Sequence, residues 1–184
     1  TRSELFEELG GFDSRFFLLV EDVDYCWRVL LRGFDVRVPD IAPVWHQGGA
    51  VAPGGYAGEG RLVSTTFRVA LRERNTLTTL IKCYGAPLAC ILVPVYAVQS
   101  LATAGVLAAS GRRRTARAVF SGLGWNIRQL RRTLRMRRHV QRSRVVGDAA
   151  ILSRMYRGVW KIHLLRHYGV PTVSEGPSPL DAAR

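Results

Sequence analysis

The chain has 184 residues, 47% of them hydrophobic, a formal net charge of +13 and an isoelectric point of about 10.9. This length allows one domain with an appendage, and the hydrophobic fraction excludes a chain that is disordered throughout. The excess of positive charge indicates an anionic partner, either nucleic acid or an anionic membrane surface. The three cysteines form no C-x-x-C pair, which argues against a disulfide framework or a zinc site and favours a reducing compartment.

The first 60 residues have the pattern of a chain in which helices and strands alternate. A short helix with Ser3 as its N-cap is predicted before the Gly10-Gly11 turn. A second helix is predicted to begin near Glu21 and to end at Gly33. We therefore expect an α/β unit over residues 1–60. Three apolar stretches have the length and composition of strands: 16–20, 34–38 and 41–46.

The rest of the chain has helical patterns. Residues 61–85 predict an amphipathic helix that closes the domain. Residues 86–110 contain no charged residue and have about the length that crosses a hydrocarbon core, roughly 20 residues. Residues 111–169 predict basic amphipathic helices, and the Pro- and Ser-containing segment 170–184 predicts a disordered tail.

Two adjacent carboxylates, Glu21 and Asp22, follow the apolar stretch 16–20 and begin the second predicted helix. A helix N-terminus favours the ionised form of a carboxylate. An ionised Asp at a strand end that faces a cleft can take a proton from a hydroxyl nucleophile. His46 follows one strand, turn and strand later, where a neutral imidazole can bind a divalent metal.

Each of these residues also has a simpler structural interpretation. Acidic residues at a helix start most often cap it. Asp24 and Arg28 have the i, i+4 spacing of a surface ion pair. Trp27 lies on the apolar helix face, where a core residue is expected, and a single His46 is most often a hydrogen-bonded structural histidine. Only the combination of residues in this order is specific.

That combination consists of a Gly-Gly-Phe-Asp turn, an apolar strand, a Glu-Asp-x-Asp-x-x-x-Arg helix, a strand between Gly33 and Pro39, and then His46. In this order the segment resembles the acceptor half of glycosyltransferase family 2 enzymes of the rhamnosyltransferase-like type, which have a GT-A fold. The resemblance covers about residues 2–85, including the helix with Arg72-x-Arg74-Asn75. It implies the C-terminal portion of a Rossmann-like α/β domain, followed by an α-helical, membrane-associating tail.

The resemblance also implies roles by position. Asp22 would be the general base that deprotonates the acceptor hydroxyl, and Glu21 would bind or orient the acceptor. His46 would be the metal ligand that joins an Asp-x-Asp motif at the diphosphate. The other residues implied to shape the acceptor site are Phe12, Asp13, Asp24, Trp27 and Arg28.

Enzymes of this type also carry an N-terminal half with a Rossmann-like start and an Asp-x-Asp metal motif. Neither is found here, since Asp22-Val23-Asp24 has the Asp-x-Asp spelling but lies in the acceptor-side motif. We therefore expect a fragment that is inactive alone. Its missing half would bind the nucleotide-sugar donor and provide most ligands of a divalent metal cofactor, Mg²⁺ or Mn²⁺.

The apolar segment 86–110 contains Pro87 and Pro94 and is followed by Arg112-Arg113-Arg114. A spanning helix, an interfacial helix and a buried helix all remain open. The basic helix after it suits an anionic membrane surface. Nucleic acid is disfavoured because no known binding module frames the arginines and few aromatic residues lie among them. These features predict a location at the cytoplasmic face of the cell membrane.

The leading hypothesis is therefore a fragment of an inverting glycosyltransferase in cell-envelope polysaccharide synthesis. It would move a hexosyl or rhamnosyl group from a nucleotide-sugar to a hydroxyl of a glycan or polyprenyl-linked acceptor. The alternative is a non-enzymatic, Arg-rich module that binds a membrane or nucleic acid, in which residues 1–60 only support the basic helices.

Overall fold

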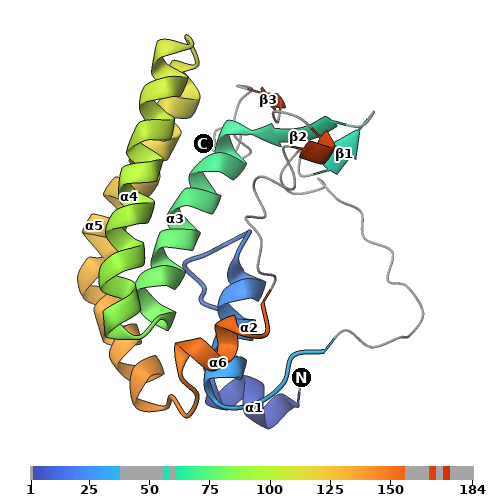
Figure 1. The fold of residues 1–184 in the computed structure, drawn as a ribbon, viewed down its shortest axis with the longest axis vertical. Helices are drawn as coiled ribbons and strands as arrows, with labels where there is room; N and C mark the ends of the chain where they lie inside the picture. Colours follow the sequence, from blue (N-terminus) through green and yellow to red (C-terminus); the bar gives the residue numbers. More distant parts are fainter. Residues whose placement is uncertain (1, 38–55, 59–60, 156–165, 169–171, 175–184) are drawn as a thin grey trace.

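A computed structural model describes residues 2–37, 56–58, 61–155, 166–168 and 172–174 of the chain, and the structural statements below concern these residues. They are mostly helical, with one small sheet at the end of the molecule opposite α1 (Figure 1). The helices are α1 (Ser3–Glu8), α2 (Glu21–Leu31), α3 (Thr66–Cys83), α4 (Ala86–Ala109), α5 (Arg113–Arg142) and α6 (Asp148–Leu152). The strands are β1 (Tyr56–Gly58), β2 (Arg61–Thr65) and β3 (Thr172–Ser174).

The sheet has the order β1-β2-β3, with β1 antiparallel and β3 parallel to β2. Val63 of β2 pairs with Tyr56 on one side and with Thr172 on the other. Strand β3 corrects the prediction of a disordered tail for 172–174, because these residues complete the sheet. Strand β2 likewise shortens the helix predicted over 61–85.

The predicted α/β class is wrong for the described residues, which form a mostly helical structure with three short strands and no Rossmann-like layer. The apolar stretch 16–20 is a loop, and 34–37 have no regular structure. Phe34 and Val36 leave 46% and 47% of their surface exposed, so neither has the buried face that makes a strand stable. The predicted strand over 41–46 lies outside the described residues.

The turns at the ends of the first two helices agree with the sequence. Gly10, Gly11 and Gly33 have φ angles of 74°, 62° and 83°, in the left-handed region that glycine adopts without steric cost. The predicted N-cap is wrong, because α1 includes Ser3 and its N-cap residue is Arg2, which makes no side-chain cap.

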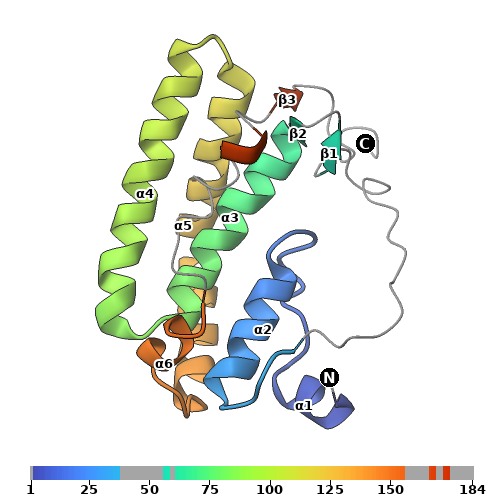
Figure 2. The ribbon, with the colours of Figure 1, turned by 45° about the vertical axis from the view of Figure 1, so that its right-hand side comes forward.

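The three long helices α3, α4 and α5 lie side by side along the length of the molecule (Figures 1 and 2). Helix α5 approaches α3 closely at Gly122, where a Cβ atom would lie 3.1 Å from the backbone nitrogen of Arg74 and 3.2 Å from the carbonyl oxygen of Ala70. One turn further, Asn126 donates to the carbonyl oxygen of Arg74 and accepts from the Thr78 hydroxyl, both at 2.9 Å. Small and hydrogen-bonded residues therefore set this helix packing.

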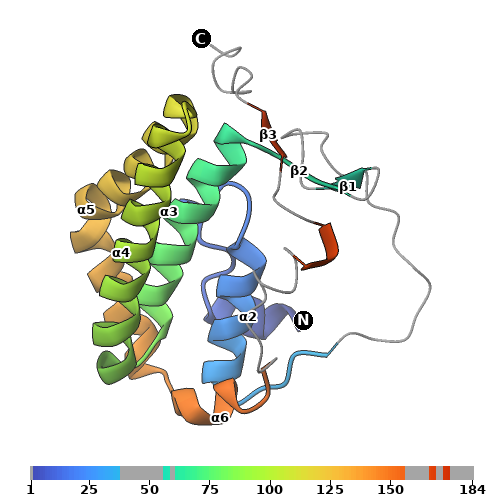
Figure 3. The same cartoon turned by 45° about the horizontal axis from the view of Figure 1, so that its top comes forward.

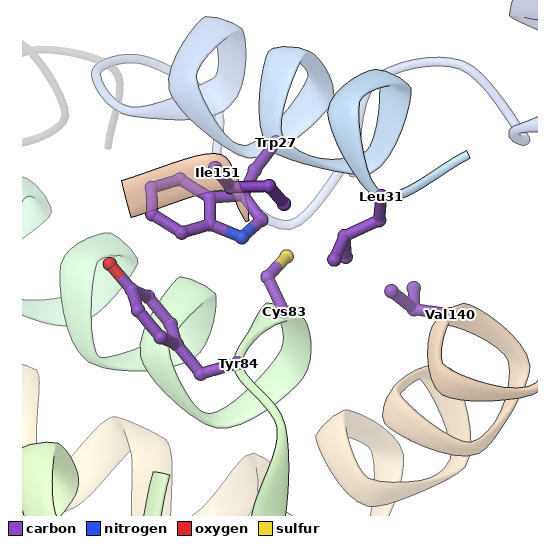
Figure 4. Packing of buried hydrophobic residues seen from close by; sticks show 6 residues of the cluster. All are labelled: Trp27, Leu31, Cys83, Tyr84, Val140 and Ile151. Atoms are coloured by element: carbon purple, nitrogen blue, oxygen red, sulfur yellow. The ribbon is translucent and has the colours of Figure 1, made fainter. Parts of the chain in front are cut away.

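Helix α2 packs against the C-terminal half of α3, with α6 beside it (Figure 3). The Trp27 and Tyr84 rings meet here with centroids 4.6 Å apart (Figure 4). Burying each large apolar side chain contributes about 1.5–3 kcal/mol, so this cluster holds α2 in place. Its buried members are Trp27, Leu31, Cys83, Tyr84, Val140 and Ile151.

Candidate functional site

The loop that leads into α2 is conformationally strained. Phe17, Leu19 and Val20 have φ angles of 62°, 68° and 69°, in the left-handed region. This conformation is rare for a residue other than glycine and costs on the order of 1–3 kcal/mol for each one. Such strain persists only where other contacts hold it, and it concentrates at functional sites. The loop ends at Glu21 and Asp22, the acid pair singled out by the sequence.

Asn75 of α3 is the first residue that holds this loop. It is fully buried, and its Nδ2 atom lies within hydrogen-bonding distance of three loop carbonyl oxygens. These belong to Phe16, Leu18 and Leu19, at 3.1, 2.9 and 2.7 Å. The amide thus provides the hydrogen bonds that a neighbouring strand would provide in a sheet, which is why an apolar run of strand length is stable here as a loop.

Arg74 is the second residue that holds the loop. Its Nη2 atom donates to the carbonyl oxygens of Arg15 and Phe16 at 2.9 and 2.8 Å. Its guanidinium lies 4.7 Å from the centre of the Trp125 ring of α5, a cation–π contact that restrains it from the other side. The Arg74-Asn75 pair therefore ties the loop before α2 to both α3 and α5.

The acid pair itself lies in the first turn of α2. Asp22 is exposed, and its Oδ1 atom accepts a hydrogen bond of 2.7 Å from the backbone N–H of Val23. Glu21 is half-buried, and one of its carboxylate oxygens is buried with no hydrogen-bond partner among the described residues. A buried acceptor without a partner is energetically costly, so this oxygen adds to the strain of the segment that leads into α2.

A buried ionic network lies beneath the acid pair. The Nζ atom of Lys82 lies 2.9 Å from a carboxylate oxygen of Asp13 and 2.8 Å from one of Asp24. Asp13 also accepts from Arg15, at 2.7 Å between Nη2 and Oδ2. Lys82 and Asp24 are both fully buried. Burial by itself raises the pKa of Asp13, but the hydrogen bonds and charges of Arg15 and Lys82 outweigh burial and hold that pKa well below its usual value.

Arg28 extends the network to the glycine turn after α1. Its Nε atom donates to Asp24 at 3.0 Å, and its two terminal nitrogens donate to the carbonyl oxygens of Leu9 and Gly11 at 2.6 and 2.7 Å. The Asp24–Arg28 pair has the predicted spacing, but the interpretation as a surface pair is wrong, because both side chains are buried. One arginine therefore fixes the Gly10-Gly11 turn against α2.

A cavity of about 660 Å³ lies along the side of α2 that faces α1 and residues 34–37. Cys26 lines it one helical turn after Asp22, and the pKa of its thiol is raised by burial and by the nearby Asp22 charge. Tyr25 also lines it, with a buried hydroxyl that has no hydrogen-bond partner among the described residues. The cavity wall contains acidic, basic and aromatic side chains; Asp22 does not line it but lies one helical turn before Cys26, which does.

The structure separates the predicted site residues into two groups. Glu21 and Asp22 lie at the surface end of α2. The remaining implied residues serve the interior, apart from Phe12, which is 52% exposed and packs edge-on against the Phe6 and Tyr25 rings. The interior residues are Asp13, Asp24 and Arg28 in the ionic network and Trp27 in the apolar cluster.

His46 lies outside the described residues, so its proximity to Asp22 stays a prediction. Within the described ranges, no group of three or more His, Cys, Asp or Glu side chains is placed to hold a metal ion. These ranges therefore do not by themselves form the expected Mg²⁺ or Mn²⁺ site.

Two residues of this region were not singled out by the sequence. Lys82 lies on the same face of α3 as buried Asn75 and Thr78. This helical spacing is the sequence signal that could have indicated a buried lysine. Tyr25 precedes Cys26 with no feature that distinguishes it from a core aromatic residue.

Comparison with models of protein families, with curated proteins and with solved structures found no match to this chain.

Proposed function

We propose that this chain provides the acceptor side of an inverting, nucleotide-sugar-dependent glycosyltransferase, with Asp22 as its general base. The observation that carries the proposal is the strained loop, held by Asn75 and Arg74, which presents an exposed carboxylate in the first turn of a rigidly packed helix. Strain of this kind is maintained where a side chain must be held in one position. The family resemblance of residues 2–85 supplies the reaction type.

In the proposed reaction the carboxylate of Asp22 takes the proton of an acceptor hydroxyl. The hydroxyl oxygen forms a bond to the anomeric carbon of the donor sugar, and the bond from that carbon to the nucleoside diphosphate breaks with inversion. Glu21, next to Asp22 in the first turn of α2, would bind or orient the acceptor. The cavity beside α2 holds the rest of the acceptor. A divalent metal bound elsewhere would stabilise the leaving diphosphate.

The buried ionic network supports this proposal because it holds the segment that carries Asp22 in one position. Lys82 joins Asp13, before the strained loop, to Asp24, after it, and so fixes both ends of the segment that carries Asp22. General-base catalysis requires the carboxylate within hydrogen-bonding reach of the proton that it removes. A segment fixed at both ends meets this requirement better than a free loop.

The test assays the full-length protein that contains this chain with a panel of nucleotide-sugars and divalent metals. We expect sugar transfer in the wild type. Asp22→Asn should abolish turnover while donor binding, measured by calorimetry, is unchanged. Glu7→Gln, which alters an exposed acid on α1, is the matched control and should retain full activity.

Full turnover in Asp22→Asn would refute the role of Asp22. Robust transfer by the 184-residue chain alone would refute the expectation that a missing half binds the donor.

A second candidate is the Arg-rich binding module, favoured by the row of exposed arginines on α5. Leu130 and Leu134 are each 40% exposed within this row, which suits a lipid surface better than the phosphates of a nucleic acid. Under this alternative Asp22→Asn changes nothing. The exposed members of the row are Arg128, Arg131, Arg132, Arg135, Arg138 and Arg142.

A further inference from the structure

Helix α4 has an unusually apolar outer surface. It spans 24 residues with a mean hydropathy of 1.8 in its most apolar window, of which only 11% is buried. Several of its large apolar side chains point outward: Ile91, Val95, Val98, Leu101 and Val106 are 60%, 58%, 66%, 47% and 67% exposed.

The inward face of α4 carries its buried polar group. Ser100 is 3% exposed and donates a hydrogen bond of 2.6 Å to Glu73 of α3. Ala104, one turn further, is fully buried on the same face. Polar groups toward the protein and apolar groups away from it are the arrangement of a helix whose outer surface contacts lipid.

The neighbouring helix decides how α4 meets that lipid. Helices α4 and α5 run antiparallel from the turn at Gly111, so residues equally far from that turn lie at the same height. Arg128 is therefore level with Pro94, and Arg131 with Ile91. A bilayer-spanning α4 would carry these exposed arginines into the hydrocarbon core, where each one weakens insertion by about a hundred-fold.

We propose that α4 lies in the plane of an anionic bilayer, with its outward face among the acyl chains and the α5 arginines at the phosphates. Arginine side chains beside an in-plane helix reach the headgroups without entering the hydrocarbon. The charge of the chain, +13, complements an anionic surface. This inference is independent of the proposed transferase activity.

The first experiment measures binding of the 184-residue chain to vesicles of phosphatidylglycerol and phosphatidylcholine, or of phosphatidylcholine alone. We expect binding to the anionic vesicles only, weakened by salt. Val98→Glu should weaken it about ten-fold or more, because a charge enters the apolar face. Val145→Glu is the control with the same charge change at a residue 75% exposed off the two helices, and it should bind nearly as the wild type does.

The second variant tests the arginines. Arg128→Gln with Arg131→Gln should weaken binding to the anionic vesicles about ten-fold or more, since each arginine near the surface contributes roughly a five-fold factor. Far-UV circular dichroism and thermal unfolding verify that each variant is folded. Equal binding to neutral and anionic vesicles, or unchanged binding in the arginine variant, would overturn the charge complementarity.

Depth measurements distinguish the two orientations. A fluorophore is placed by cysteine substitution at Ile91, Val98 or Val106, in a chain with Cys26→Ser and Cys90→Ser, and quenched by lipids labelled at known depths. An in-plane helix gives three equal depths of about 5–10 Å below the headgroups. A spanning helix places Val98 deepest, with the two end positions about 10 Å shallower. The spanning result would overturn the proposal.

The apolar face of α4 could instead be covered by a second copy of the chain. Sedimentation velocity without lipid reports it: a dimer that Val98→Glu dissociates, together with no binding to vesicles, would replace the bilayer by a protein partner and overturn the proposal. A monomer that binds anionic vesicles supports it.

Discussion

Two regions of this molecule depart from the usual distribution of groups in opposite ways: one buries charge and the other exposes apolar side chains. Beneath α2 the interior contains charge, because Lys82, Asp13 and Asp24 meet with almost no exposure to water. On α4 the exterior is apolar, and Val98 and Val106 lie open. Charge in the interior is tolerated where each ion has a partner, whereas an apolar exterior is tolerated where something other than water covers it. The first region fixes the segment that carries Asp22, and the second is the surface that we propose to lie in a bilayer.

The largest effect is expected from breaking the charged interior. Asp24→Asn removes the negative charge that Arg28 and Lys82 share; buried Arg28 then has no carboxylate partner and Lys82 keeps only Asp13, so the free energy of unfolding should fall by about 3–5 kcal/mol. Urea unfolding measures it. The control is Asp35→Asn, which breaks the exposed pairs with Arg37 and Arg154 and should change the stability little. Equal losses in both variants would remove the distinction between the interior network and the surface.

Acid should weaken the same region next. Because the pKa of folded Asp13 lies well below its usual value of 3.8, its stabilising contribution is complete above that value and is lost as the pH falls below it. Asp13→Asn should therefore be less stable than the wild type at pH 7, and the difference should shrink as the pH falls from 4 toward 2. Urea unfolding of both proteins at each pH tests this. A difference that does not depend on pH would contradict it.

A smaller effect compares two glycines of α5. Gly122→Ala should cost about 1–3 kcal/mol, because its Cβ would meet the α3 backbone at 3.1 and 3.2 Å. Gly124→Ala has nothing within 4 Å of its Cβ and should stabilise the helix by about 0.5–1 kcal/mol. Thermal unfolding measures both. Stabilisation by Gly122→Ala as well would mean that α3 and α5 can move apart without cost.

The smallest effect concerns the strained loop. Val20→Gly should raise the free energy of unfolding by about 1 kcal/mol, because glycine adopts φ 69° without strain. Val23→Gly, three residues later in α2, should lower it by about 1 kcal/mol, because its backbone is helical. Chemical denaturation compares the two. A loss in Val20→Gly would show that the loop is not under strain.

Several local features were predictable because neighbouring residues decide them. Helical spacing and the glycine turns located α2, and the charge-free composition located α4. The strand predicted over 16–20 was wrong because composition does not tell which groups will take up the backbone hydrogen bonds. The side chain of Asn75, which lies far along the chain, bonds the loop carbonyl oxygens in place of a neighbouring strand. Buried Lys82 was missed for a similar reason, since its two carboxylate partners come from distant segments.

The sequence by itself determined the helical segments, the acid pair that begins α2 and the apolar, charge-free character of α4, because periodicity, composition and glycine turns act over short distances. Only the tertiary structure decided which charges lie inside and which face of α4 lies outside. Both depend on contacts between segments distant in the chain: Lys82 is buried where Asp13 and Asp24 reach it, and α4 turns Ser100 toward Glu73 and Leu92 toward the apolar cluster, which leaves its valines on the outer face.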